Sequence, residues 1–250
     1  MAKFLLKKSY QLNNLKLIKY DDLWGAKGIF TTIRVIGKKP KFILFNNHID
    51  NMNKALKKIN INFVVTKKLI LELLQPQLNK LKDKDCLLRI AVSNNKISLS
   101  IRLRLNPQKN FVGILYSFQR KMPKLKNLYY KKIIKLLSSI NLEKKEIILI
   151  SKGILLEGCT TNIFCVYNKI IYMPSKNYYR GITMDYLLKK NKRKVKKIDI
   201  PIKSLNKYEE IFLVGSGKGV LRLKSIPEIN WKSRSDLIYK EFKRSYKKIL

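Results

Sequence analysis

The chain has 250 residues, and 46% of them are apolar, which is enough to bury a sizeable core and excludes a wholly disordered protein. Its apolar runs fall well short of the roughly 18 to 20 residues that cross a bilayer. The N-terminal apolar segment is also too short for a signal peptide. We therefore expect a soluble, cytoplasmic protein with no membrane partner.

The formal charge of +39 is spread along the whole chain. Lysines occur in nearly every segment, together with many Ile, Asn and Tyr residues, whose codons are AT-rich. This distribution indicates codon bias rather than a dedicated nucleic-acid surface, so we expect nucleic acid not to be the partner. The run KKNKRKVKK at 189–197 is the best candidate for a basic patch, and a solvated helix end is its preferred interpretation.

Cysteine and histidine are scarce. The three cysteines form no CxxC pair, and His48 is the single histidine, so we expect no metal site. Nucleophilic catalysis of the Ser-His or Cys-His kind needs an imidazole beside the nucleophile. If the chain is an enzyme, its base is therefore expected to be a lysine or a carboxylate.

The first part of the chain has the pattern of a small α+β unit. Apolar periodicity predicts two strands in 28–45, a helix over 48–59, a helical stretch over 67–81 broken by Pro76, and two strands in 86–105. We assign residues 1–108 to a small N-terminal α+β domain.

An irregular segment with two prolines follows, and we interpret residues 109–122 as a linker. Residues 123–250 are expected to form a larger, β-rich C-terminal domain. Its predicted elements are a helix over 127–140, a strand over 146–151, a hairpin within 150–174, a short helix after 181, a strand over 210–214 and a final helix over 235–250. The fold class is therefore α+β with two domains.

Three features of the second half are unusual for a purely structural domain. Glu157 stands in an apolar run, just before a small polar turn. Lys126 opens a predicted helix directly after the irregular segment. The turns RGITMD and VGSGKGV are rich in glycine and hydroxyl residues, whose backbone N–H groups can gather around an anion.

The segment GSGKGV is not a nucleotide P-loop. That motif needs a glycine five positions before Gly217, where this chain has Phe212, and a hydroxyl residue after the lysine, where it has Gly219. A phosphate bound at this turn would belong to a smaller ligand.

The ordered set Lys126, LLEGCTTNIF, GITMD and FLVGSGKGV resembles the fold-type IV enzymes that use pyridoxal phosphate. These enzymes include branched-chain and D-amino acid aminotransferases and 4-amino-4-deoxychorismate lyases. The early segments GIFTTIRV and HIDN also resemble the N-terminal motifs of this family, so the likeness covers most of the chain. By this resemblance we expect a homodimer that acts on a small-molecule substrate.

The resemblance also assigns roles. Lys126 would hold the cofactor covalently and move protons on the substrate, with Lys124 as the rival lysine. Glu157 would face the pyridine nitrogen, where a carboxylate keeps that nitrogen protonated. The remaining cofactor-binding residues implied by the family motifs are Ile182, Thr183 and Ser216 for the phosphate and Tyr130 for the ring hydroxyl, the last because it follows Lys126 by one helical turn.

Two positions depart from the family pattern. Asn51 stands where an arginine normally grips the phosphate, and Met184 stands where GIT is usually followed by arginine. Lys54, one helical turn after Asn51, is a possible substitute for the missing charge.

Thr31 stands where aminotransferases of the family generally carry glutamate. The segment FTTIRVI instead resembles the corresponding segment of the 4-amino-4-deoxychorismate lyases of folate synthesis, which release pyruvate and 4-aminobenzoate. By that resemblance Thr31, Thr32 and Arg34 would shape the substrate pocket. The alternatives are an aminotransferase that passes an amino group to a 2-keto acid, and a catalytically degenerate nucleic-acid-binding or scaffold protein.

Overall fold

The computed structural model describes residues 3–250, which divide into two units. The first unit contains the residues up to 104 together with 125–131, and the second contains 105–124 and 132–250. Strands dominate both units and helices are few, so the predicted α+β class is confirmed. Within residues 3–250, no helix combines the length and the apolar character that a membrane crossing requires.

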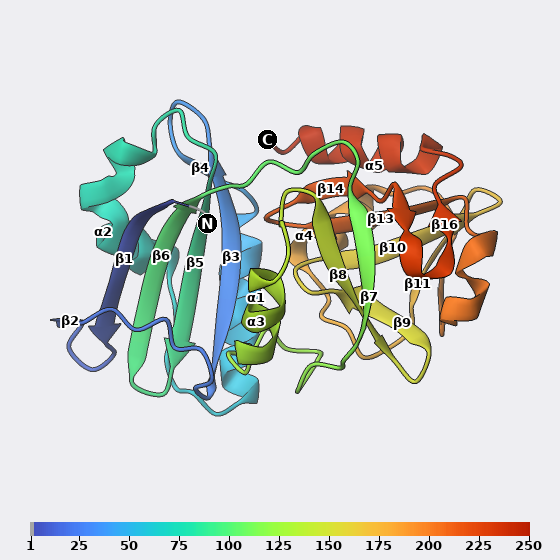
Figure 1. The fold of residues 1–250 in the computed structure, drawn as a ribbon. Coiled ribbons are helices and arrows are strands. Elements are labelled where there is room, and N and C mark those ends of the chain that lie inside the picture. Colours follow the sequence, from blue (N-terminus) through green and yellow to red (C-terminus); the bar gives the residue numbers. More distant parts are fainter. Residues whose placement is uncertain (1–2) are drawn as a thin grey trace. The chain divides into compact units, whose positions relative to one another are not determined.

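The first unit is an antiparallel sheet with helices on one face (Figure 1). Within the described chain its strand order is β2-β1-β6-β5-β3-β4. Its elements are β1 (Phe4–Gln11), β2 (Leu17–Ile18), β3 (Gly28–Ile36), β4 (Lys41–Phe42), α1 (Phe45–Lys58), α2 (Lys67–Leu74), the 3-10 helix η1 (Gln75–Leu81), β5 (Cys86–Ser93) and β6 (Lys96–Leu103).

Helix α1 forms because its apolar residues recur at helical spacing and face the sheet. Phe45, Ile49, Met52 and Leu56 are all buried, in a core shared with β3, β5 and β6. The predicted interruption at Pro76 is confirmed, since α2 ends at Leu74 and the chain continues as a 3-10 helix.

The second unit contains two sheets, ordered β16-β15-β7-β8-β9 and β12-β11-β10-β13-β14 over the described residues. Its elements are β7 (Val112–Ser117), α3 (Lys131–Ser138), β8 (Lys145–Ser151), β9 (Ile154–Gly158), β10 (Asn162–Tyr167), β11 (Ile170–Pro174), α4 (Ile182–Lys190), β12 (Val195–Ile198), η2 (Ile202–Lys207), β13 (Glu210–Gly215), β14 (Gly219–Arg222), β15 (Ser225–Ile226), η3 (Pro227–Ile229), β16 (Trp231–Lys232) and α5 (Leu237–Lys247). One hydrophobic cluster joins residues of the two sheets, and another joins β10, β11 and β13 to α4 and α5.

The segment interpreted as a linker belongs to a sheet. Residues 112–117 form β7, which pairs in parallel with β8 along its whole length. A parallel partner lies far away in sequence, so a short strand of this kind gives no local hairpin signal. Residues 109–122 therefore lie inside the second unit.

The expected hairpin over 150–174 is half right. Strands β10 and β11 pair across a turn in which Asn168 and Lys169 both have positive φ, the conformation of a tight two-residue hairpin turn. Strand β9, however, pairs with β8 and lies in the other sheet. The polar residues after Glu157 therefore carry the chain from one sheet to the other.

Candidate active site

Lys126 lies in an extended segment that pairs with the first residues of β3, whose last residues pair with β4. The Phe30 N–H donates to the Lys126 carbonyl at 2.9 Å, and the Leu128 N–H donates to the Gly28 carbonyl at 2.9 Å. The expectation that Lys126 opens a helix is wrong, because these backbone groups are used in sheet pairing and α3 begins only at Lys131.

The pairing places the Lys126 amine beside an aromatic ring. Its Nζ lies 4.8 Å from the centre of the Phe30 ring, and the side chain is half-buried. Lys124, the rival, is exposed. A reactive amine works from a partly desolvated place rather than from open solvent, so this placement favours Lys126.

Tyr130 also packs against Phe30, although residues 126–130 do not form the helical turn that was expected to bring it near Lys126. Its ring centre lies 5.1 Å from that of Phe30 and 5.6 Å from that of Trp24, and Trp24 lies edge-on to Phe30 at 4.9 Å. Lys126 and Tyr130 are thus brought together around Phe30. Tyr130 as a ligand of the cofactor hydroxyl stays a prediction.

The two threonines of β3 point to opposite faces of the sheet, because strand side chains alternate. Thr31 is buried and hydrogen-bonds His48 Nδ1 on α1 at 2.7 Å. Thr32 lies on the face that carries Phe30. At most one of the two can therefore contact a substrate on a given face, and the substrate role of each stays a prediction.

Arg34 forms an ion pair with Asp85 in the first unit. Its Nε and Nη2 donate to the two Asp85 carboxylate oxygens at 2.8 and 2.7 Å, and Arg104 lies 3.1 Å from the same carboxylate. This two-point contact fixes the Arg34 guanidinium. Its predicted contact with substrate would therefore have to coexist with the Asp85 pair.

His48 is only 4% exposed. Burial, and secondarily the charge of Lys126, lower the pKa of His48 from 6.5 to about 3. The imidazole is thus neutral at physiological pH, and it serves as the buried partner of Thr31.

This buried imidazole should make the protein sensitive to acid. Between pH 6.5 and about 3 the unfolded chain binds a proton at His48 that the folded chain does not, so stability is complete above pH 6.5 and falls as the pH decreases. The loss at pH 4.5 is expected to be roughly 3 kcal/mol.

Urea unfolding at pH 7 and pH 4.5 measures that loss. His48→Asn keeps a polar atom near the Nδ1 position and removes the titration, so the variant should lose clearly less stability than the wild type over this interval. Equal losses in both proteins would contradict the assignment.

Glu157 is the penultimate residue of β9 and is 4% exposed, yet its charge is balanced by a buried cation. Arg120 donates to Oε1 through Nε at 2.8 Å and through Nη2 at 2.7 Å, and the Tyr179 N–H donates to Oε2 at 3.0 Å. The Arg120 guanidinium also donates to the Pro123 carbonyl at 2.8 Å. A carboxylate offers about four acceptor positions, so these contacts are compatible with a further donor such as a protonated ring nitrogen.

Sequence reasoning missed Arg120, which stands in the segment taken as a linker. The signal that could have found it is Glu157 itself, because a carboxylate in an apolar run needs a cation. The spacing of residues around Glu157 does not show which of the many basic residues supplies that cation.

A turn held by Asn162 leads into α4. The Gly181 N–H donates to Asn162 Oδ1 at 3.1 Å, and Asn162 Nδ2 donates to the Tyr179 carbonyl at 2.5 Å. A Cβ at Gly181 would lie 2.5 Å from Asn162 Oδ1, so a larger residue here would displace the Asn162 side chain from this contact. Ile182 then begins the helix, with its first N–H groups available to an anion.

The structure brings together two predicted phosphate ligands. Thr183 Oγ1 on α4 lies 3.1 Å from Ser216 Oγ in the turn between β13 and β14. A Cβ at the neighbouring Gly215 would lie 2.8 Å from the Thr160 carbonyl, so the turn passes close to the chain after β9. Two hydroxyls beside a helix N-terminus form a donor set that suits a phosphate.

The two departures from the family pattern differ in their surroundings. Met184 is 1% exposed and belongs to the core between β13 and α4, so it is a packing residue. Asn51 is half-buried on α1, and Lys54 is exposed one turn later. Lys54 as a replacement for the arginine stays a prediction.

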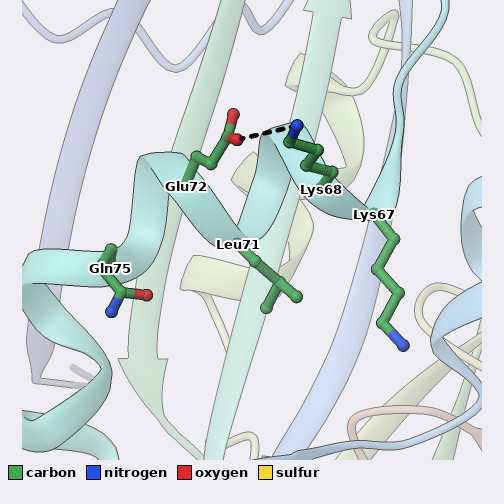
Figure 2. Close-up of a pocket in the computed structure, with 5 residues that line it drawn as sticks. All are labelled: Lys67, Lys68, Leu71, Glu72 and Gln75. Carbon is green, nitrogen blue, oxygen red and sulfur yellow. Dashed lines mark ion pairs between the residues drawn. The ribbon is translucent and has the colours of Figure 1, made fainter.

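A surface pocket lies on helix α2, apart from the predicted site residues (Figure 2). It is lined by Lys67, Lys68, Leu71, Glu72 and Gln75, and the Lys68–Glu72 ion pair spans 4.0 Å on exposed side chains. None of the predicted site residues lines it. Among the described residues, no group of three or more His, Cys, Asp or Glu side chains could hold a metal ion.

Comparison with known proteins connects these residues to a family. The family model described as "Amino-transferase class IV" matches residues 28–226. An aminodeoxychorismate lyase of Bacillus subtilis (strain 168) is 25% identical over 259 residues, which cover 90% of this chain and 86% of that protein.

Two solved structures share the fold. A branched-chain aminotransferase of the archaeon Thermoproteus uzoniensis, with norvaline, superposes with a TM-score of 0.79 at 17% identity, covering 96% of this chain and 93% of that one. A hypothetical aminotransferase of Mycobacterium tuberculosis, in a PLP-bound form, gives a TM-score of 0.74 at 12% identity and covers 98% of each chain.

Proposed function

The chain belongs to the class IV aminotransferase family, and on that premise we propose that it is a pyridoxal-phosphate-dependent lyase that converts 4-amino-4-deoxychorismate to 4-aminobenzoate and pyruvate. The family predicted from the motifs is confirmed, and the chain is therefore an enzyme. The lyase reaction, its place in folate synthesis, the homodimer and the cytoplasmic location are parts of the proposal.

The donor set supports the cofactor. The first unit supplies a half-buried lysine amine, and the second unit supplies a buried carboxylate and two hydroxyls beside a helix N-terminus; these are the kinds of group that pyridoxal phosphate needs. When bound, pyridoxal phosphate supplies an electron sink that stabilises negative charge at the substrate carbon that carries the amine.

Each residue of this chain then has a definite task. Lys126 would hold the cofactor through its amine, and the same amine is placed to take the proton from the amine-bearing carbon of the substrate. Glu157 would face the ring nitrogen, where a carboxylate keeps that nitrogen protonated. Thr183, Ser216 and the Ile182 N–H would donate to the phosphate.

The similarity to the Bacillus subtilis aminodeoxychorismate lyase is the observation that carries the choice of lyase. Thr31 adds to it only indirectly, because its hydroxyl faces His48 on α1. The aminotransferase alternative is favoured by the fold likeness to branched-chain aminotransferases, a likeness at low identity.

The products decide between the two reactions. Purified protein loaded with pyridoxal phosphate is given 4-amino-4-deoxychorismate in one assay, and glutamate or leucine with a 2-keto acid in another. We expect equal amounts of pyruvate and 4-aminobenzoate in the first assay, and a far slower amino transfer in the second. Amino transfer without 4-aminobenzoate would replace the lyase by an aminotransferase, and the absence of both reactions would contradict both assignments.

A further inference from the structure

The lysine of the GSGKGV turn points at a buried carboxylate. Lys218 Nζ lies 3.3 Å from Glu146 Oε2, donates to the Leu142 carbonyl at 2.9 Å, and lies 4.6 Å from the centre of the Phe111 ring. The Lys218 side chain is 11% exposed, and that of Glu146 is fully buried. The charge of this lysine is therefore balanced within the protein, unlike that of a P-loop lysine, which faces its nucleotide.

Glu146 also accepts hydrogen bonds from the turn that follows Glu157. The Thr160 N–H donates to Glu146 Oε1 at 3.0 Å, and Thr160 Oγ1 donates to Oε2 at 3.0 Å. One carboxylate on β8 thus binds Thr160 in the turn after β9 and Lys218 in the turn before β14. These are the two turns that meet at Gly215.

The second of these turns carries a proposed phosphate ligand. Ser216 stands two residues before Lys218, and its hydroxyl lies 3.1 Å from that of Thr183. Donors to a phosphate must be held within a fraction of an ångström to bind it well, and buried charged contacts in their support are one way to hold them.

We propose that Lys218 and Glu146 are positioning residues, whose buried ion pair fixes the Ser216 turn so that its donors fit the cofactor phosphate. This inference rests on the proposed function, since it assumes that Ser216 and Thr183 bind that phosphate. In this proposal neither Lys218 nor Glu146 contacts the phosphate, and both act by holding the Ser216 turn in place.

The test separates the phosphate from the rest of the cofactor. Dissociation constants are measured for pyridoxal phosphate and for pyridoxal, which lacks the phosphate, on the full chain and its variants. The ratio of the two constants reports the phosphate contribution, and thermal unfolding without ligand reports the fold. A residue with a merely structural role would change both constants together.

Lys218→Met should weaken pyridoxal phosphate binding roughly tenfold, the equivalent of about 1.4 kcal/mol, and leave pyridoxal binding nearly unchanged. Lys218→Arg, which keeps the charge, should restore most of the lost affinity. The double variant Lys218→Met with Glu146→Gln avoids an unpaired buried carboxylate, so it tests the same point if the single variant does not fold.

An unchanged ratio in the folded variants, or equal weakening of both ligands, would overturn the inference. A wild-type protein that binds the two ligands equally would instead overturn the proposed phosphate site, and the inference with it. These results are distinct, because the second is seen before any residue is changed.

Discussion

Replacing Lys126 with alanine is expected to abolish covalent attachment of pyridoxal phosphate and to lower the turnover rate by at least about a thousandfold, because one amine both holds the cofactor and moves the substrate proton. Lys124→Ala should retain nearly full activity. The two lysines differ by two positions in sequence, but the amine of Lys126 lies against Phe30, while Lys124 is exposed.

Borohydride reduction followed by peptide mass analysis measures the attachment directly. The reduced cofactor should be found on the peptide position of Lys126 in the wild type and be absent from Lys126→Ala. Attachment at Lys124, or loss of activity in Lys124→Ala with normal activity in Lys126→Ala, would reverse the assignment.

Breaking the Arg120–Glu157 pair is expected to cost about 3 to 5 kcal/mol of folding free energy in Arg120→Met, because the variant leaves a buried carboxylate without its cation. Both side chains are almost fully buried and are joined by two short hydrogen bonds. Glu157→Gln also leaves a buried charge unpaired, that of Arg120, although its amide oxygen can still accept a hydrogen bond from the guanidinium. It should in addition impair catalysis, because an amide cannot keep the cofactor nitrogen protonated.

The Lys68–Glu72 pair is the matched control for this measurement. Figure 2 shows this pair on α2. Its side chains are exposed and lie 4.0 Å apart, so Lys68→Met should change stability by less than about 0.5 kcal/mol. Urea unfolding compares the two variants. Similar small effects would show that the Arg120 contact contributes no more than a surface ion pair.

Local pattern predicted much of this fold. Helix α1 and the strands β5 and β6 show their periodicity directly, because each has one face on the core of the first unit. The proline at 76 ended a helix as expected. The hairpin turn at Asn168 and Lys169 could be predicted because the two residues alone determine it.

Pairing between distant segments could not be predicted in this way. The strand β7 finds its partner β8 only across about thirty residues, and the segment around Lys126 pairs with β3 across nearly a hundred. Local pattern therefore predicts a linker for the first segment and a helix start for the second, and the structure contradicts both predictions. Their backbone hydrogen bonds depend on the fold as a whole, and the local sequence carries little trace of them.

The candidate site shows the same division. The resemblance to the fold-type IV family implied cofactor-binding roles for Glu157, Thr183 and Ser216, and the hydroxyls of the last two lie 3.1 Å apart. Arg120 could not be predicted, because its contact with Glu157 depends on the folded core and follows from no sequence spacing. In a chain with 55 lysines and arginines, the identity of a single buried cation requires a structure.

A titration of the purified protein with pyridoxal phosphate, followed by its visible absorption spectrum, tests directly whether Lys126 binds the cofactor. We expect a lysine-bound chromophore that saturates at one cofactor per chain and that disappears in Lys126→Ala. A spectrum that remains the sum of free protein and free cofactor at saturating concentration would contradict this expectation.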